Sequence, residues 1–256
     1  MDRRILSKIN IESSPLYKDN LGSFNLFKKI VFICDDSESM NGDTYNDDNF
    51  NIQKSRFNEM RDLLSVILQF LKSRNDLNKK HPIYRCDVRF INRIDKNLFD
   101  LLKEDDAISK LETAFNAINE GNGPKDLTKL FNSIIAEANS EIDGKILVIM
   151  FTDMEIADLK SFRNAIERTQ IRGHEKAFVS LVALAKNEKK NILNEWDQQI
   201  RHFDVTYYYE AEKKIVEGPK KFKTQQSFNR EFTHADYFTK ILFGSVVQSI
   251  NLLDKN

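Results

Sequence analysis

A carboxylate and two hydroxyls follow an apolar run near the beginning of the chain. Residues 31–34 are Val-Phe-Ile-Cys, and Asp35, Ser37 and Ser39 come directly after them at alternate positions. A continuous apolar run is typical of a strand buried on both faces, so these polar side chains are predicted to lie in the loop that leaves its carboxyl end. Their oxygens are hard ligands of the kind that Mg²⁺ prefers. The spacing therefore predicts a site for a divalent cation.

A second buried strand is predicted to end in a similar way. Residues 145–151 read Lys-Ile-Leu-Val-Ile-Met-Phe and are followed by Thr152 and Asp153. Open α/β sheets bind ligands beyond the carboxyl ends of their strands, at the point where the strand order reverses. If the two predicted strands are neighbours at that point, their loops converge on one site. The chain pattern alone does not fix the strand order.

Segments typical of strands and helices alternate along the chain. We expect strands at residues 29–34, 86–91, 97–101 (the weakest), 145–151, 177–183 and 205–209. We expect helices at about residues 52–74, 106–119, 127–139, 159–169, 190–201 and 234–253. This alternation indicates βαβ units, and it predicts a Rossmann-like, doubly wound, mostly parallel α/β sheet with helices on both faces.

The length of 256 residues suits one large domain, and hydrophobic residues make up 41% of the chain, enough for a substantial core. We expect residues 1–26 to form a polar lead-in. Residues 27–256 are expected to form a single domain, including a polar excursion at about residues 210–232 and a C-terminal helix.

Charge and composition argue against several classes of partner. Lys+Arg and Asp+Glu both number 39, which disfavours a general binder of nucleic acid or of acidic membranes. No apolar run approaches the ~20 residues that span a bilayer, and no signal peptide is expected. The cysteines, Cys34 and Cys86, are predicted near opposite ends of adjacent strands, so a disulfide is not expected. These features predict a cytoplasmic protein with no nucleic-acid or membrane partner.

Four segments match one known pattern. Ile-Cys-Asp-Asp-Ser-Glu-Ser-Met at 33–40 looks like a Val-Asp-Asp-Ser-Gly-Ser-Met opening, and Phe-Thr-Asp-Met-Glu-Ile-Ala-Asp at 151–158 looks like a Thr-Asp-Gly-x-Pro-Thr-Asp segment. Arg-Phe-Asn-Glu-Met-Arg-Asp at 56–62 and Asp-Val-Arg-Phe-Ile-Asn at 87–92 look like the helix and strand that come between them. Together these segments resemble the von Willebrand factor A (vWA) domain family, over roughly residues 28–210.

The resemblance implies a fold, a site and a kind of activity. The family has a Rossmann-like α/β fold and a metal-ion-dependent adhesion site. This site binds Mg²⁺ or Mn²⁺, and a carboxylate of a protein partner completes the coordination of the ion. Its activity is binding rather than catalysis. By position, Asp35, Ser37 and Ser39 would be ligands from the first loop, and Asp153 a direct or water-mediated ligand. Met154 stands where the family has glycine.

One position departs from the family pattern. The remaining family ligand is a threonine in a Gly-x-Thr-Pro-Leu loop, and the matching stretch here places Lys125 at that position. An ammonium has no lone pair, so it cannot ligate a metal, but it can neutralise Asp35 and Asp153. Two hypotheses stay open: Lys125 replaces the ion and no cofactor is bound, or Thr128 or a water molecule completes a Mg²⁺ or Mn²⁺ shell.

Three functions follow from these patterns. The first is a non-catalytic protein–protein interaction module that binds a partner, through an Asp or Glu side chain, at the rim formed by Asp35, Ser37, Ser39 and Asp153. The second is a structural subunit of a larger assembly. The third is a Mg²⁺-dependent phosphohydrolase with Asp35 as nucleophile. This third function is disfavoured, because Ser37 occupies the position where such enzymes need a second carboxylate as general acid.

Overall fold

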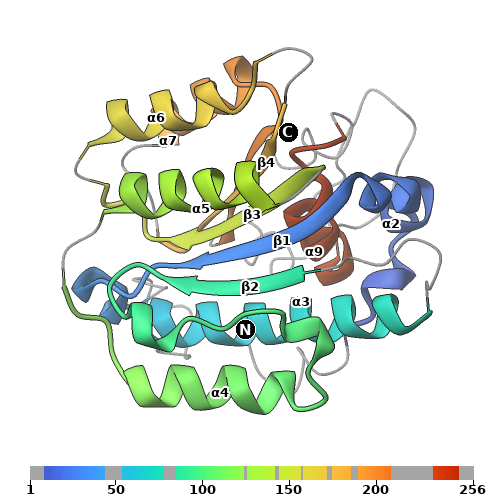
Figure 1. Cartoon of the computed structure of the whole chain (residues 1–256), viewed down its shortest axis with the longest axis horizontal. Coiled ribbons are helices and arrows are strands. Elements are labelled where there is room, and N and C mark those ends of the chain that lie inside the picture. Colours follow the sequence, from blue (N-terminus) through green and yellow to red (C-terminus); the bar gives the residue numbers. More distant parts are fainter. Residues whose placement is uncertain are drawn as a thin grey trace.

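A parallel sheet forms the centre of the molecule (Figure 1). The computed structural model describes residues 9–43, 54–77, 85–123, 126–141, 144–156, 158–171, 175–185, 190–208 and 233–247. Within these residues the sheet has five strands, in the order β2-β1-β3-β4-β5, and every neighbouring pair is parallel. The strands are β1 (Phe27–Cys34), β2 (Arg85–Phe90), β3 (Lys145–Thr152), β4 (Ala177–Ala183) and β5 (Phe203–Tyr207). This arrangement confirms the predicted Rossmann-like, doubly wound α/β fold.

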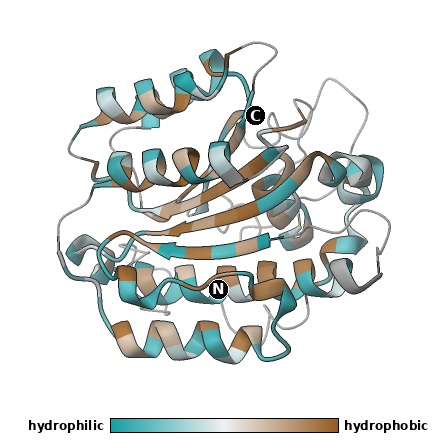
Figure 2. Cartoon of the chain, viewed as in Figure 1, coloured by the Kyte–Doolittle hydropathy of each residue, from teal (hydrophilic) through white to brown (hydrophobic). Residues whose placement is uncertain are grey.

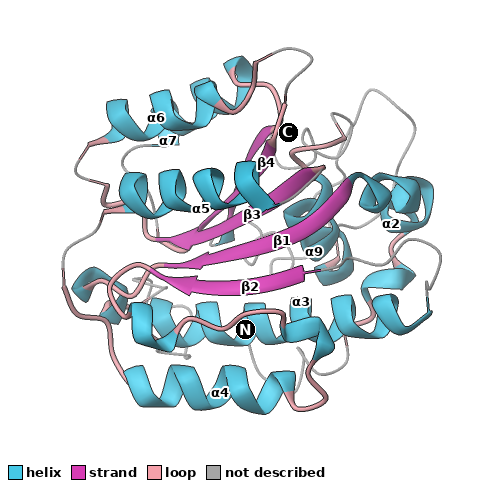
Figure 3. Ribbon diagram, viewed as in Figure 1, coloured by secondary structure: helices cyan, strands magenta, loops and turns pink. Residues whose placement is uncertain are grey.

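Both faces of the sheet are covered by helices (Figures 1 and 3). One face packs against α3 (Arg56–Leu77), α4 (Ala107–Ile118) and α9 (His234–Phe243). The other face packs against α5 (Leu127–Glu141), α6 (Leu159–Arg168) and α7 (Lys190–Gln199). None of the helices in the described part of the chain is long and apolar enough to cross a bilayer.

Burial on two faces explains why the central strands are almost continuously apolar (Figure 2). Alternate residues of β1 point to opposite faces, so Ile30 and Phe32 pack towards α3 while Val31 and Ile33 pack towards α5. All four side chains are fully buried. The apolar run that predicted β1 therefore reflects its central position in the sheet.

Part of the segment predicted as a polar lead-in contributes to the core. It contains η1 (Ile11–Ser13), α2 (Pro15–Asn20) and η2 (Leu21–Leu26). Ile11 and Tyr17 are buried, and the Tyr17 ring lies 6.0 Å from that of Phe243 on α9. The Ser14 hydroxyl donates to Asp236 Oδ1 of α9 at 2.7 Å. Residues from both ends of the described chain thus pack together on one face of the sheet.

The predicted strand at residues 97–101 is wrong. Leu98 forms only an isolated antiparallel bridge with Val88, through two backbone hydrogen bonds of 2.8 and 2.9 Å. Phe90 N donates to the side-chain oxygen of Asn97 rather than to its backbone. Asp100 then adopts a left-handed conformation with φ 53°, and a short 3₁₀ turn, η5 (Leu101–Lys103), follows. The extended pairing ends because this backbone conformation cannot continue a strand.

The two cysteines lie where the sequence predicted. Cys86 pairs in register with Ile30, near the amino end of β1, and Cys34 is the last residue of that strand. Both thiols are free and fully buried. Burial raises the pKa of each thiol well above its ordinary value, and the nearby carboxylates raise it further. Three other predictions, on Lys125, on residues 210–232 and on a helix beyond residue 247, fall outside the described residues.

Candidate functional site at the carboxyl edge of the sheet

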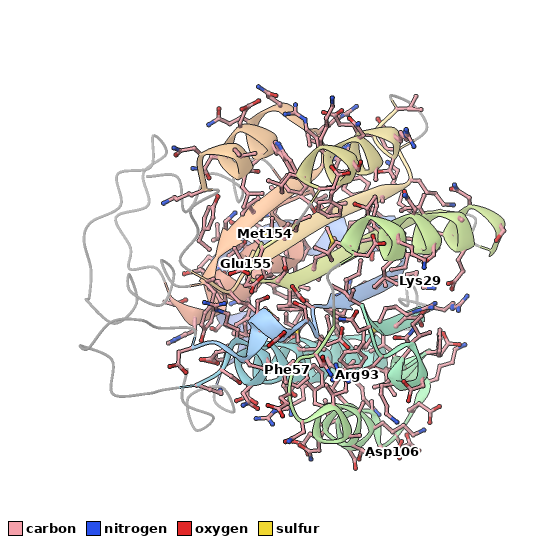
Figure 4. All side chains as sticks on the ribbon, turned by 90° about the vertical axis from the view of Figure 1, so that its left-hand side faces the viewer. Lys29, Phe57, Arg93, Asp106, Met154 and Glu155 are labelled. Carbon is pink, nitrogen blue, oxygen red and sulfur yellow. The ribbon has the colours of Figure 1, made fainter. Side chains whose placement is uncertain are left out.

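The strand order reverses between β1 and β3. After β1 the chain continues to β2 on one side, and after β3 it continues to β4 on the other side. The predicted convergence of the two strand ends is therefore confirmed: Cys34 pairs with Phe151, and Asp35 N donates to Phe151 O at 3.1 Å. Figure 4 looks towards this carboxyl edge, with Met154 and Glu155 labelled in the loop after β3 and Arg93 labelled after β2.

Asp35 lies at the centre of the site and is fully buried. Its Oδ1 accepts hydrogen bonds from Ser37 N at 3.1 Å and from Ser37 Oγ at 2.5 Å. Its Oδ2 accepts from Thr152 Oγ1 at 2.6 Å. These bonds join the loop after β1 to the end of β3. The hydroxyls that hold this carboxylate also carry lone pairs, so they are both donors here and potential metal ligands.

The two serines of the first loop are adjacent. Ser37 precedes the short 3₁₀ turn η3 (Glu38–Asn41), which turns the chain back so that Ser37 Oγ and Ser39 Oγ lie 3.2 Å apart. Together with the Ser37–Asp35 bond, this contact places one carboxylate and two hydroxyls in a single connected group. The structure thus brings together Asp35, Ser37 and Ser39, as their spacing predicted.

Asp153 is the first residue after β3, and its side chain is buried. Its Oδ1 accepts from Glu155 N at 3.1 Å, and its Oδ2 lies 3.3 Å from Arg56 Nη1. The same Arg56 nitrogen donates to Ser39 O at 2.9 Å. Arg56 therefore ties the loop after β1 to the loop after β3. Sequence reasoning used this residue only as part of a family-like helix and gave it no role at the site.

A second arginine holds the loop after β1 from the β2 side. The Asp36 carboxylate is fully buried and accepts from Asn92 N at 2.8 Å, Arg93 N at 3.1 Å and Arg93 Nη1 at 3.1 Å. Burial raises the pKa of Asp36, although the bonds from Asn92 and Arg93 oppose that rise. Arg93 Nη2 also donates to Glu120 O at 3.1 Å. The doubled aspartate was the only sequence signal for this contact.

The connection between α4 and α5 presses against the same loop. The Asn41 side chain makes two hydrogen bonds with the backbone of Gly121, donating to its oxygen at 2.9 Å and accepting from its nitrogen at 2.6 Å. A Cβ atom at Gly121 would lie 2.0 Å from Ser37 O, so only glycine fits this approach. The end of β3, the residues after β2 and the connection between α4 and α5 thus all contact the loop that carries Ser37.

The remaining predicted residues are placed less completely. Thr128 is half-buried on the first turn of α5, and Lys125 lies outside the described residues. Met154 is buried and adopts φ 67°, a left-handed conformation that glycine, the family residue at this position, would adopt without strain. Its backbone N donates to Thr152 Oγ1 at 3.1 Å, and this same hydroxyl donates to Asp35.

The donor set at this edge fits a hard cation. A carboxylate with two hydroxyls offers the oxygen ligands that Mg²⁺ and Mn²⁺ accept, with further positions left to water or a partner. In the described residues no group of three or more His, Cys, Asp or Glu side chains could hold a metal ion. Any cation at this edge would therefore depend on the serine hydroxyls together with Asp35.

The fold and this edge define a Rossmann-like α/β domain with a carboxylate–hydroxyl cluster at its switch point. No protein-family model matches the sequence, and no curated protein matches it.

Proposed function

We propose that this chain is a non-catalytic interaction module of the vWA type, which binds a protein partner at the rim formed by Asp35, Ser37, Ser39 and Asp153. The observation that carries the proposal is the 2.6 Å hydrogen bond from Thr152 Oγ1 to Asp35 Oδ2. This bond joins the two strand ends, so that the polar residues of the two loops act as one site.

A divalent cation would give this rim its binding chemistry. Asp35, Ser37 and Ser39 would hold Mg²⁺ or Mn²⁺, and the ion would accept an Asp or Glu carboxylate of the partner as an additional ligand. In the alternative that the sequence left open, the Lys125 ammonium replaces the ion, and the partner binds without metal. Both forms use the same rim, and they differ in their response to added metal.

The residues around Asp35 favour binding over phosphoryl transfer. A phosphohydrolase with Asp35 as nucleophile would need a general acid near residue 37. Here Ser37 Oγ lies 2.5 Å from Asp35 Oδ1 and serves as a hydrogen-bond donor to it. A hydroxyl with an ordinary pKa is a poor general acid at neutral pH. We therefore expect no hydrolysis of a generic aryl phosphate in the presence of Mg²⁺.

Thermal unfolding with and without Mg²⁺ or Mn²⁺ tests the metal. A ligand that binds only the native state raises the melting temperature by mass action. We expect a rise in the wild type and none in Asp35→Asn, which keeps the shape of the side chain but removes its charge. A wild type that does not respond, with a rise in Lys125→Thr, would show that Lys125 replaces the ion. No rise in either protein would contradict a metal site.

Binding of a short peptide tests the partner chemistry. The probe is a fluorescent Gly-Ser-Gly-Asp-Gly-Ser peptide with blocked ends, and its Asn counterpart is the matched control. We expect the Asp peptide to bind more tightly than the Asn peptide. If the site is metal-loaded, this preference should require Mg²⁺. If Lys125 replaces the ion, the preference should be the same in Mg²⁺ and in EDTA. Equal binding of the two peptides under both conditions would contradict carboxylate recognition at this rim.

A further inference from the structure

Arg56 is the first residue of α3 and reaches across the site. Its Nη1 is shared between Ser39 O at 2.9 Å and Asp153 Oδ2 at 3.3 Å. The approach is tight, since a Cβ atom at Gly42 would lie 3.3 Å from this nitrogen. The backbone supports the same position, because Arg56 N donates to Gly42 O at 3.0 Å. The guanidinium is thus built into the loop that carries the serines.

The contact with Asp153 has consequences for charge. The Asp153 side chain is buried and that of Arg56 is only 20% exposed, so solvent screens this pair less than a surface ion pair. Arginine stays protonated at every relevant pH, so its charge is permanent. A divalent cation close to Asp153 would therefore meet a fixed positive charge at the very carboxylate that it would need as a ligand.

We propose that Arg56 is the built-in counter-cation of Asp153: it reserves this carboxylate, joins it to the loop after β1, and leaves Asp35, Ser37 and Ser39 as the ligands available to a divalent cation. This inference rests on the proposed function for its metal, but the ion pair itself does not. The guanidinium of Arg56 keeps its positive charge at the rim whether or not a metal is bound. Arg56 is a positioning residue here, since it acts on the site through Asp153 and Ser39.

Thermal unfolding in EDTA tests the ion pair without any metal. The proteins are the wild type, Arg56→Gln, Asp153→Asn and the double variant. We expect each single variant to lower the melting temperature and the double variant to lower it by clearly less than the sum, because the ion pair between the two side chains is lost only once. Additive losses would overturn the proposal.

Arg93 supplies the matched control for this cycle. It lies at the same edge with a similar exposure of 24%, but it pairs with Asp36. A cycle of Arg93→Gln with Asp153→Asn is therefore expected to be additive, and it corrects for any general loosening of the rim. Coupling as large as in the Arg56 cycle would also overturn the proposal, because it would mean that Asp153 is not specifically paired with Arg56.

Mn²⁺ titration, followed by the electron paramagnetic resonance signal of the free ion, tests which carboxylate ligates. We expect Asp35→Asn to abolish binding and Asp153→Asn to weaken it by no more than the order of tenfold that loss of one nearby charge explains. Arg56→Gln should tighten binding on the order of tenfold, because it removes a positive charge near the ion, and Arg56→Lys, which keeps the charge, should not.

The two measurements separate two kinds of failure. Loss of Mn²⁺ binding in Asp153→Asn, equal to the loss in Asp35→Asn, would make Asp153 a ligand and overturn the inference. If neither the wild type nor any variant binds Mn²⁺, the metal part of the proposed function fails, while the cycle in EDTA still decides whether Arg56 is the partner of Asp153.

Discussion

Two fully buried carboxylates, Asp87 on β2 and Asp35 directly after β1, are satisfied in different ways. Asp87 on β2 lies 2.7 Å from the buried ammonium of Lys29 on β1, and that ammonium also lies 2.8 Å from Glu137 of α5. Arg89 Nη2 lies 2.7 Å from Glu137 Oε2, and Arg85 makes longer contacts with both acids. The hydrogen bonds described for Asp35 come instead from the hydroxyls of Ser37 and Thr152 and from a backbone amide.

The difference lies in the groups that surround each carboxylate. In the group formed by Lys29, Asp87, Arg89 and Glu137, which we call the Lys29 network, cations are permanently built in, and this offsets the cost of burying the acids. At the Asp35 site the hydroxyl oxygens that hold the carboxylate can also coordinate a cation. The Lys29 network thus contributes to the stability of the fold, while the proposed function gives the Asp35 site a role in ligand binding. Four substitutions test this distinction, from the largest expected effect to the smallest.

Lys29→Met should have the largest effect on stability. It leaves Asp87 buried with only the longer contacts to Arg89 at 3.4 Å and Arg85 at 3.9 Å, so we expect the free energy of unfolding in urea to fall by about 3 kcal/mol. The double variant Lys29→Met/Asp87→Leu removes both charges and should recover most of that loss. A loss below about 1 kcal/mol in the single variant would contradict a structural role for the Lys29 network.

Gly121→Ala should disturb the Asp35 site through its backbone. The new methyl group would lie 2.0 Å from Ser37 O, so the loop must move, and we expect a loss of about 1–3 kcal/mol in urea unfolding. Gly22→Ala is the control, because a Cβ there meets nothing within 4 Å, and it should stay within about 0.5 kcal/mol of the wild type. Equal effects of the two substitutions would mean that the connection between α4 and α5 does not hold the site.

Thr152→Val removes one hydroxyl while it keeps the shape of the side chain. Asp35 Oδ2 and Met154 N both lose their bond to Thr152 Oγ1, so we expect a loss of about 1–2 kcal/mol in the same assay. Thr113→Val, at an exposed position of α4, should have no measurable effect. If Thr152→Val were as neutral as this control, the proposed joining of the two strand ends by Thr152 would be refuted.

Glu137→Gln should change the response to acid. Burial opposes ionisation of Glu137, but Lys29 and Arg89 together hold its pKa below the ordinary value. In the window between the lowered native pKa and the ordinary one, the unfolded chain binds the proton and the native chain does not, so stability rises with pH there. The wild type should therefore lose this contribution as the pH falls below the ordinary range of a glutamate.

The stabilisation from Glu137 is fully present at neutral pH. We expect Glu137→Gln to lower the melting temperature slightly at pH 7 and to show a weaker decline than the wild type between about pH 5 and 3. Glu112→Gln, an exposed glutamate of α4, is the control and should follow the wild type. Parallel acid profiles of the wild type and Glu137→Gln would show that the Lys29 network does not lower the pKa of this residue.

The elements buried on both sides could be read from the sequence. The strands β1 and β3 were predicted because burial on two faces leaves an uninterrupted apolar run, and the convergence of their ends follows once the sheet is doubly wound. The prediction of a strand at 97–101 failed because this segment pairs with β2 only through the bridge between Leu98 and Val88 and then turns at Asp100. Neither feature leaves a pattern of apolar residues in the sequence.

The contacts that complete the site could not be read in this way. Arg56 meets Asp153 across 97 positions of the chain, and Asn41 meets Gly121 across 80. The local sequence pattern gives no information on such pairs, because an arginine at the start of a helix can point into solvent as readily as form a buried ion pair. Lys29 was likewise counted only as part of an apolar strand, although its charge pairs with Asp87 on β2 and Glu137 on α5.

The buried cysteines give the molecule an internal reporter of opening. Cys34 ends the central strand β1 and Cys86 lies on β2 at the edge of the sheet, and both thiols are inaccessible and hard to ionise in the native fold. Both lie in the core on the face covered by α3, α4 and α9, so an alkylating reagent can reach each thiol only when this part of the fold opens. The ratio of the two labelling rates would reveal whether the edge of the sheet frays on its own or only when the whole domain unfolds.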